Sequence, residues 1–501
     1  MRDLGLTHAL ILAAGVGSRL EELSAHYPKT LVKVNGREIL DYQLKAYLNA
    51  GVREENIHIV VGYKAEQVMR FLQANYPLVN VIRNENFSVT NNMFSLYLAL
   101  KGLLKVPFER LLINNADCIY DEALVAEFVD DAAKNAIAAQ SGCYNEESMK
   151  LSGSPQKLTN IAKTTPKEES FGVSCDLYKF SREAVEELFE VVCEFVEVKK
   201  QLNLWSEVAF VPLFQRVNVR ACDIKGRRWF EIDNKEDLAN ACALFSDFDI
   251  TRKKALICDM DGTLYVGERA IEEAIKFVKE AKGLDFYFLT NNTSKTPQDY
   301  AAKLASFGIN ASLEQILTPL YTLIDFVKNE GLKSVYLVAN ERVSRFVQEA
   351  LPNVKFEFDK SSNEAVVLTY DTQLSYDKLS KACELLADES VLYIATHEDI
   401  FCPCEFGKAP DIGSFIALLN ATTNRRPQVV LGKPSPLLCA PLVARYGKES
   451  LAVVGDRLTT DKKLAQNLDC DFVLVLTGET TWLDLQKQER FKGVTLPHLT
   501  F

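Results

Sequence analysis

The sequence of 501 residues lacks any uninterrupted apolar stretch of the roughly 18 residues that a membrane-spanning helix needs. It also lacks an excess of positive charge, because 57 Lys and Arg stand against 68 Asp and Glu, a net charge of −11. Proteins that bind nucleic-acid backbones or anionic membranes normally carry the opposite sign. We therefore expect no nucleic-acid partner and no membrane insertion. Small anionic substrates stay compatible with this charge, because bound metal ions can outweigh it locally.

The paired cysteine spacing of disulfide-rich or zinc-binding proteins is missing as well. The 12 cysteines are scattered, and the closest two, Cys402 and Cys404, have no recognisable partners for a zinc site. Near the N-terminus, the apolar run Ala9–Ala14 ends in a glycine turn rather than in a signal-peptide cleavage site. These features predict a reduced, cytoplasmic protein, and a homo-oligomer is compatible with them.

Two segments of the chain open alike, with a short apolar strand that runs into a polar loop. These strands are Ala9–Ala14 and Ala255–Cys258, and alternating strand-like and helix-like runs follow each of them. Such alternation predicts parallel sheets with helices on both faces and catalytic groups at the carboxyl ends of the strands. We expect two α/β domains with doubly wound parallel sheets, residues 1–245 and 255–501, joined by a short polar linker, 246–254.

The first polar loop is glycine-rich and reads Ala13-Ala14-Gly15-Val16-Gly17-Ser18-Arg19. Its glycines allow backbone N–H groups to approach phosphate oxygens, and Arg19 can bind the same oxygens. The loop is neither a dinucleotide fingerprint nor a P-loop, because Leu20 replaces the third glycine and no Gly-Lys-Ser/Thr follows. A turn that merely ends the strand is the alternative. We take Ala13, Ala14, Gly15, Gly17 and Arg19 as candidate nucleotide-binding residues.

A lysine and two acidic segments accompany this loop. They are Lys29 in Pro28-Lys29-Thr30-Leu31, Asp117 in Asn115-Ala116-Asp117, and Asp233 in Trp229-Phe230-Glu231-Ile232-Asp233. Together with the glycine turn they resemble the sugar-phosphate nucleotidyltransferases over roughly residues 8–245. The resemblance implies a Rossmann-like fold, Mg²⁺ on Asp117 and Asp233, and a catalytic Lys29. Glu231 and Asp233 would share one face of a strand, and a half-exposed edge strand is the alternative interpretation.

Within that family, the segments 91–96 and 229–233 look most like the CTP:phosphocholine cytidylyltransferase branch. This resemblance implies CTP and a small phosphorylated alcohol, such as phosphocholine, a polyol phosphate or a glycerol phosphate, as substrates. Asn92, Trp229 and Glu231 are the candidate substrate-binding residues. Trp229 could cap a cationic headgroup or be a core aromatic. UTP or dTTP with a sugar 1-phosphate is the alternative substrate pair.

The chemistry implied for the first half follows from charge. The substrate phosphate attacks the α-phosphorus of the nucleotide and pyrophosphate leaves, so anionic groups must be neutralised before they meet. Mg²⁺ would bridge the phosphates, Lys29 would stabilise the transition state, and Arg19 with the loop amides would hold the leaving group. A general base is not needed, because the attacking phosphate oxygen is already ionised.

The second polar loop reads Asp259-Met260-Asp261-Gly262-Thr263-Leu264. Two carboxylates in this spacing can divide the work, one attacking phosphorus and the other protonating the leaving alkoxide and then activating water. Further along the chain come candidate phosphate-binding residues, a lysine and an acidic pair, namely Thr290, Asn291, Lys433, Asp456 and Asp461. In this order, the motifs resemble the haloacid dehalogenase superfamily.

The long insertion after Thr290 resembles the C2-type cap of the p-nitrophenylphosphatase-like branch, and we expect it over roughly residues 315–410. The resemblance implies a catalytic pair, Asp259 and Asp261, with Lys433, and Mg²⁺ held by Asp259, the carbonyl of Asp261 and Asp456, with Asp461 in support. The substrate would be a phosphomonoester. Its leaving group stays open, because Pro410-Asp411-Ile412-Gly413 departs from the Pro-Gly-x-Gly turn that relatives tend to have.

The leading hypothesis is a bifunctional enzyme, a Mg²⁺-dependent cytidylyltransferase followed by a phosphatase. The fusion suggests one pathway, such as the supply of a CDP-activated alcohol for a cell-surface polysaccharide. The alternative is a C-terminal module that senses a phosphorylated metabolite without hydrolysing it. The retention of Asp259, Asp261, Lys433 and Asp456 argues against that alternative.

Overall fold

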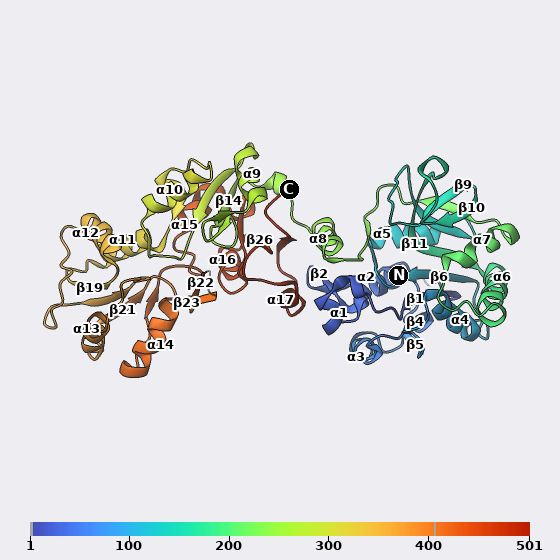
Figure 1. Ribbon diagram of the computed structural model, residues 1–501, viewed down its shortest axis with the longest axis horizontal. Coiled ribbons are helices and arrows are strands. Elements are labelled where there is room, and N and C mark those ends of the chain that lie inside the picture. Colours follow the sequence, from blue (N-terminus) through green and yellow to red (C-terminus); the bar gives the residue numbers. More distant parts are fainter. Residues whose placement is uncertain (1–3, 405–406) are drawn as a thin grey trace. The chain divides into compact units, whose positions relative to one another are not determined.

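The computed structural model describes residues 4–404 and 407–501 and divides into two compact units (Figure 1). Unit 1 comprises the chain up to Phe245 together with Trp482–Arg490, and unit 2 comprises Ser246–Thr481 and Phe491–Phe501. Both units alternate strands and helices, so the predicted α/β class is confirmed. Among the described residues, no helix is long and apolar enough to cross a membrane.

Unit 1 is built on a nine-stranded sheet with β1 (Thr7–Ala13) near its centre. Every residue of β1 is buried, which explains the apolar run in the sequence. Alternate β1 side chains enter two hydrophobic cores, Leu10 and Leu12 on one face and Ala9 and Ile11 on the other, so helices cover both faces. The other strands are β4 (Ile57–Val61), β5 (Asn80–Arg83), β6 (Arg110–Asn115), β8 (Ala136–Ser141), β9 (Lys150–Ser154), β10 (Lys157–Ala162), β11 (Gly172–Ser181) and β12 (Arg220–Asp223).

This sheet is mixed, whereas the sequence predicted a parallel one. Strands β5, β4, β1 and β6 are parallel, but β11 runs antiparallel to β6, β8 and β9. Four short strands lie outside the sheet, β2 (Lys33–Val34), β3 (Arg37–Glu38), β7 (Cys118–Tyr120) and β13 (Trp229–Glu231). The helices are α1 (Glu22–His26), α2 (Ile39–Asn49), α3 (Ala65–Asn75), α4 (Asn92–Leu103), α5 (Glu122–Asp130), α6 (Arg182–Cys193), α7 (Glu207–Arg216) and α8 (Lys235–Leu244).

The register of the central strands places the predicted motifs side by side. Leu12 of β1 pairs with Asn115 of β6, so the glycine turn and the Asn115–Asp117 turn leave the sheet at the same edge. The short β13 pairs with β7 so that Glu231 lies opposite Cys118, next to Asp117. Segments about a hundred residues apart in the chain therefore meet at one edge of the sheet.

The core of unit 2 is a six-stranded parallel sheet in the order β18-β17-β14-β25-β26-β27. Strand β14 (Ala255–Asp259) is entirely buried between β17 and β25. The remaining elements of this core are β15 (Tyr265–Val266), β16 (Arg269–Ala270), β17 (Asp285–Leu289), β18 (Ile316–Leu317), β25 (Leu451–Gly455), β26 (Asp471–Val475), β27 (Gly493–Leu496), α9 (Glu272–Glu280), α10 (Pro297–Ser306), α15 (Ala440–Tyr446) and α16 (Asp461–Leu468).

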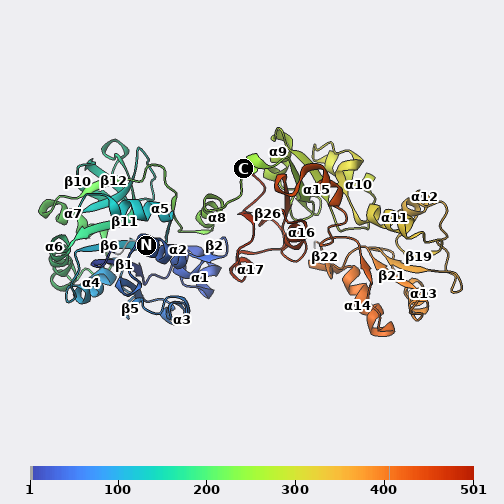
Figure 2. The same ribbon diagram turned by 180° about the vertical axis from the view of Figure 1, so that it is seen from behind.

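A cap with its own four-stranded parallel sheet is inserted between β18 and α15, drawn from yellow to orange in Figures 1 and 2. It continues beyond the expected end at residue 410, because α14 packs in the same core as α13 and β24 completes the sheet. Its elements are α11 (Pro319–Glu330), β19 (Val335–Val338), α12 (Glu341–Ala350), β20 (Ala365–Leu368), α13 (Tyr376–Leu386), β21 (Leu392–Ala395), β22 (Phe401–Cys404), β23 (Gly407–Pro410), α14 (Ile412–Thr423) and β24 (Val429–Val430).

One segment from the second half of the chain packs in unit 1 instead of unit 2. The sequence did not indicate this exchange. The last helix, α17 (Trp482–Gln486), and the residues up to Arg490 belong to unit 1, although they were expected in the second domain, 255–501. Trp482 and Leu483 pack against a hydrophobic cluster of unit 1 that includes Leu20, Val32 and Ile232. Apolar burial against this cluster accounts for the exchange.

Candidate active sites

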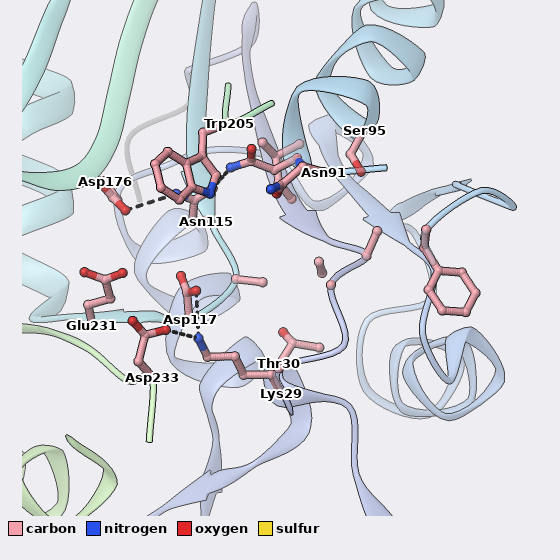
Figure 3. Close-up of a pocket in the computed structure, with 18 of the residues that line it drawn as sticks. Lys29, Thr30, Asn91, Ser95, Asn115, Asp117, Asp176, Trp205, Glu231 and Asp233 are labelled. Atoms are coloured by element: carbon pink, nitrogen blue, oxygen red, sulfur yellow. Dashed lines mark hydrogen bonds and ion pairs between the residues drawn. The ribbon is translucent and has the colours of Figure 1, made fainter. Parts of the chain in front are cut away.

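A pocket opens at the carboxyl edge of the unit 1 sheet (Figure 3). The nucleotide-binding candidates Ala13, Ala14, Gly15, Gly17 and Arg19 all line it. Gly17 has a φ of 66°, which favours glycine, and a Cβ at this position would lie 2.8 Å from the Cβ of Lys29. The glycine turn therefore lets the backbone pass close to the lysine.

Lys29 lies between two carboxylates in this pocket. Its Nζ is 2.9 Å from Asp117 Oδ2 and 2.8 Å from Asp233 Oδ1, and Figure 3 shows both contacts. Burial alone would lower the pKa of Lys29, but the charges of Asp117 and Asp233 outweigh burial and raise it. Arg19 adds a second cation, with Nη2 2.8 Å from Asp233 Oδ2. The predicted lysine and metal ligands thus form one charged cluster.

Glu231 belongs to the same cluster, whereas the sequence assigned it to the substrate. Carboxylate oxygens of Asp117, Glu231 and Asp233 lie within 4.8 Å of one another, close enough to share one metal ion. Burial, followed by the charges of Asp176, Asp117 and Asp233, raises the pKa of Glu231 to about 9. Without a bound cation, Glu231 therefore holds its proton at neutral pH.

The other end of the pocket contains two buried acids that the sequence analysis missed, Asp176 (6% exposed) and Glu207 (1% exposed). Asn115 Nδ2 donates to Asp176 at 3.0 Å and to Glu207 at 3.3 Å, and the Tyr178 hydroxyl, which can donate to one of them at a time, lies 2.9 Å from a carboxylate oxygen of each. Burial and the charge of Glu207 raise the pKa of Asp176 to about 7. One signal in the sequence was an acidic residue between two apolar ones, Cys175 and Leu177, of a strand.

Asp176 reaches the pocket through a local irregularity of β11. Its φ is 52°, in the left-handed region, and the pairing between β11 and β8 shifts register between Ser174 and Tyr178. A conformation that is unfavourable for a non-glycine residue is typical of functional sites, where the surrounding structure enforces it. Here it coincides with the side chain that carries the buried charge.

Of the remaining substrate-binding candidates of unit 1, Asn92 lies in the pocket and Trp229 does not. Asn92 lines the pocket, where its Nδ2 donates to Asn115 Oδ1 at 3.1 Å. Trp229 is not among the described residues that line it, because its ring packs in a core and its indole N–H donates to Gln140 Oε1 at 3.1 Å. The tryptophan in the pocket is Trp205, which is 47% exposed. Figure 3 labels Trp205 among the residues that line the pocket.

In unit 2 a second lysine lies between two carboxylates, at the carboxyl edge of the parallel sheet. Lys433 Nζ forms ion pairs with Asp259 and with Asp461, the latter at 2.7 Å. Burial opposes the charge of Lys433, but Asp259 and Asp461 outweigh it and raise the lysine pKa. Burial, only partly offset by Lys433, raises the pKa of Asp259. All three side chains are nearly inaccessible to solvent.

Asp456 completes this cluster, and the loop before α17 holds it. Its Oδ2 accepts the Glu479 N–H at 2.6 Å and its carbonyl accepts the Thr480 hydroxyl at 2.5 Å. A Cβ on Gly262 or Gly478 would overlap the Asp456 carboxylate. The other oxygen, Oδ1, is buried with no hydrogen-bond partner among the described residues. A buried, unpaired carboxylate oxygen fits a cation ligand.

Both carboxylate clusters fit Mg²⁺. Asp259, Asp456 and Asp461 offer oxygens within 4.8 Å of one another, as Asp117, Glu231 and Asp233 do in unit 1. Clustered carboxylate oxygens are the ligands this ion prefers. The Asp261 side chain lies outside the described cluster, which leaves only its carbonyl as the expected ligand.

The other predicted residues of unit 2 lie around this cluster. Burial raises the pKa of Asp261, which favours the protonated form that a general acid needs. Thr290 is buried directly after β17. Asn291 holds Lys433 in place, because its Oδ1 accepts the Lys433 N–H at 2.7 Å and its Nδ2 donates to the Lys433 carbonyl at 3.2 Å.

The cap adds two acids that the sequence did not assign. Asp399 Oδ2 lies 3.3 Å from both Asn291 Nδ2 and Arg457 Nη1, so a cap side chain contacts both core motifs. Asp411, at the turn that departs from the family pattern, bonds His397 Nε2 at 3.0 Å. His397 is fully buried. The departure at position 411 thus introduces a buried Asp–His pair into the cap.

Comparison with known proteins assigns families to both halves. Residues 256–351 match the haloacid dehalogenase-like hydrolases and residues 430–500 a HAD-hydrolase-like family. The chain is 33% identical over 232 residues to 5′-nucleotidase YutF of Bacillus subtilis, which is 45% of this chain and 88% of that protein. Through its C-terminal half, this chain belongs to the haloacid dehalogenase-like hydrolases. Residues 9–150 match the MobA-like NTP transferase domain, so the predicted fusion of a nucleotidyltransferase with a haloacid dehalogenase-like phosphatase is confirmed.

Two further relatives are similar to the hydrolase half. The chain is 30% identical over 240 residues to an acid sugar phosphatase of Staphylococcus aureus, covering 47% of this chain and 91% of that protein. The crystal structure of a 4-nitrophenylphosphatase from Thermotoga maritima covers 50% of this chain and 96% of its own, with 36% identity and a TM-score of 0.46.

The raised pKa of Glu231 predicts a pH-dependent stability of unit 1. Between its ordinary value of 4.5 and about 9, the folded protein holds a proton that the unfolded chain releases, so stability falls as pH rises. Glu231→Gln removes this titration and should flatten the fall in the melting temperature of metal-free protein between pH 5 and 9. The exposed Glu236→Gln is the matched control and should keep the wild-type slope. An unchanged slope in Glu231→Gln would contradict the assignment.

The contact of Gly478 with Asp456 predicts that the hydrolase site tolerates no side chain there. Gly478→Ala should displace the carboxylate, raise the Mg²⁺ concentration for half-maximal hydrolysis of an aryl phosphate and lower the rate by about 10- to 100-fold. Gly102→Ala is the control, since its Cβ would meet nothing within 4 Å. Wild-type Mg²⁺ dependence in Gly478→Ala would refute the expected role of Asp456.

Proposed function

We propose that this protein is a bifunctional enzyme whose nucleotidyltransferase is a Mg²⁺-dependent cytidylyltransferase and whose hydrolase cleaves phosphomonoesters. The observation that carries the proposal is the shared design of the two sites, each with a lysine, partly buried in unit 1 and buried in unit 2, between carboxylates that can hold a divalent ion. The predicted cytoplasmic location and homo-oligomer remain predictions.

In unit 1, the attacking phosphate oxygen of the acceptor forms a bond to the α-phosphorus of the nucleotide, and the bond to pyrophosphate breaks. Lys29 donates to the oxygens on which negative charge gathers, and Arg19 with the turn amides holds the leaving pyrophosphate. Asp117, Glu231 and Asp233 would hold Mg²⁺, which neutralises phosphate charge when bound. Binding of the ion favours ionised Glu231, which otherwise holds a proton.

We propose that the acceptor is a cationic phosphorylated alcohol of the phosphocholine type. The pocket is lined by five carboxyl groups against three basic side chains, and two of the five, Asp176 and Glu207, lie outside the metal cluster. At the end away from Lys29, Asp176 and Glu207 are buried, and the half-exposed Trp205 ring already has a cation over it, Lys163 Nζ at 5.5 Å from its centroid. Carboxylates beside an aromatic ring favour a quaternary or primary ammonium group. A neutral polyol or glycerol phosphate would leave these charges uncompensated.

In unit 2, Asp259 attacks the phosphorus of the ester and forms an aspartyl phosphate. The bond to the leaving alcohol breaks, and Asp261 supplies the proton that the alkoxide takes up. Asp261, now ionised, accepts a proton from the water that cleaves the aspartyl phosphate and releases inorganic phosphate. Lys433 and the Thr290 hydroxyl bind the phosphoryl oxygens, while Asp259, Asp456 and Asp461 would hold Mg²⁺.

The fusion favours two steps of one pathway, such as the supply of a CDP-activated alcohol for a cell-surface polymer. A C-terminal module that only senses a metabolite is the weaker alternative, because Lys433, Asp259, Asp456 and Asp461 lie together in one buried cluster, which a site without turnover would not need. A UTP- or dTTP-dependent enzyme for sugar 1-phosphates is the alternative for unit 1.

Substitutions at the two sites should separate the activities. Asp117→Ala should abolish nucleotide-dependent pyrophosphate release, because it removes a metal ligand and a partner of Lys29, and it should spare hydrolysis of an aryl phosphate. Asp259→Asn should abolish hydrolysis through loss of the nucleophile and spare pyrophosphate release. Both rates are measured on each purified variant. Loss of both activities in either variant would contradict two chemically independent sites.

A screen of CTP, UTP, dTTP and ATP against phosphocholine, glycerol 3-phosphate, a polyol phosphate and glucose 1-phosphate tests the acceptor. CTP with phosphocholine should release pyrophosphate fastest. Glu207→Gln and Trp205→Ala should each raise the KM for phosphocholine about tenfold, equivalent to about 1.4 kcal/mol, and leave the KM for CTP within twofold. Trp229→Phe is the control. A neutral acceptor preferred by the wild type would exclude the cationic class.

A further inference from the structure

The segment Trp482–Arg490 packs behind the residues that form the nucleotidyltransferase site. Trp482 and Leu483 join a hydrophobic cluster that includes chain neighbours of functional side chains. Leu20 follows Arg19, and Ile232 lies between Glu231 and Asp233. Val32 donates its N–H to the Lys29 carbonyl at 3.1 Å. The cluster therefore supports the glycine turn, the lysine turn and the metal-ligand strand from their far side.

Polar contacts fix the same segment to the strand that follows Lys29. The Lys33 N–H donates to Gln486 Oε1 at 2.6 Å, and Gln486 Nε2 donates to the Lys33 carbonyl at 3.4 Å. Gln486 is only 4% exposed, so both bonds are shielded from water. Through them, its side-chain amide satisfies the backbone N–H and the carbonyl of Lys33. Gly36, with a φ of 78°, leaves room for the Arg490 backbone, which a Cβ would overlap. The contact is thus built from apolar, polar and backbone complementarity.

We infer that Trp482–Arg490 is a positioning element of the nucleotidyltransferase, with Trp482 and Gln486 as positioning residues for Lys29, Arg19 and the Glu231–Asp233 pair. The inference rests on the proposed function of the unit 1 pocket. Neither Trp482 nor Gln486 is among the described residues that line the pocket. They act through the turns that carry Lys29 and Asp233, because a shift of about 1 Å in a catalytic group can cost a hundredfold in rate.

The acceptor end of the pocket has a different support, which gives the inference a specific signature. Asp176 and Glu207 lie on β11 and α7, whose side chains pack in the two cores of the main sheet rather than in the cluster with Trp482. Loss of the positioning element should therefore impair turnover and metal dependence without weakening acceptor binding. A general loosening of unit 1 would impair all three.

The test uses the full-length chain and the acceptor and nucleotide that give wild-type pyrophosphate release. Trp482→Ala should lower kcat at least tenfold and raise the Mg²⁺ concentration for half-maximal rate, with the acceptor KM within twofold. Gln486→Ala should produce the same pattern to a smaller extent, and Trp482→Phe should restore most of kcat. Lys487→Ala, an exposed residue of the same segment, is the matched control and should behave as wild type.

Hydrolysis of an aryl phosphate by unit 2 serves as an internal measure of intact protein in every variant. Wild-type kcat and Mg²⁺ dependence in both Trp482→Ala and Gln486→Ala would overturn the inference, as would an acceptor KM that rises in step with the loss of kcat. If Trp482→Ala does not fold, the Gln486→Ala result decides. Absence of pyrophosphate release in the wild type across the nucleotide and acceptor screen would instead refute the proposed function.

Discussion

Each half of this protein depends on a lysine, partly buried in unit 1 and buried in unit 2, whose charge is balanced by carboxylates at the carboxyl edge of a sheet. Lys29 lies between Asp117 and Asp233, and Lys433 between Asp259 and Asp461. A buried cation is costly unless such partners compensate it, and the partners in turn need the cation. A bound phosphate and a bound divalent ion would each add charge to these clusters. The lysine would pair with the phosphate and the carboxylates with the ion. The arrangement therefore joins fold stability to catalysis in both units.

The sequence predicted well what short segments determine locally. Lys29, Asp117, Asp259 and Asp456 follow buried strands or fixed turns, so their approximate places followed from the α/β pattern and from the strands' parallel edges. The α/β class and the fusion were predictable for the same reason. The cap was predicted in kind but not in extent, because α14 and β24 join it only through packing in its core.

What the sequence could not show depends on contacts between distant segments. Asp176 enters the pocket through an irregular register of β11, and Glu207 reaches it from the start of a helix that follows a long loop. Trp229 resembled a headgroup ligand, yet its neighbours on β13 and β7 turn it toward Gln140, and Trp205 takes the open position. Helix α17 packs in unit 1 because Trp482 and Leu483 contact the apolar cluster around Leu20. No local sequence pattern predicted this contact.

The exchange of α17 has a consequence for how the fusion is understood. The residues before it, Glu479 and Thr480, hold Asp456 of the hydrolase, whereas Trp482 and Gln486 pack in the nucleotidyltransferase. A cut at residue 245 would therefore remove a part of unit 1 that the chain supplies only near its end. Unit 1, which contains the nucleotidyltransferase match, is therefore not structurally complete without a segment from the C-terminal half.

The most direct test of this account is a crystal structure of the full-length protein grown with Mn²⁺, with anomalous scattering measured to locate the ions. We predict one ion bound by Asp117, Glu231 and Asp233 and a second bound by Asp259 and Asp456, with Asp461 beside it. An absence of ions from either cluster at millimolar Mn²⁺, or ions bound only elsewhere, would contradict the central claim.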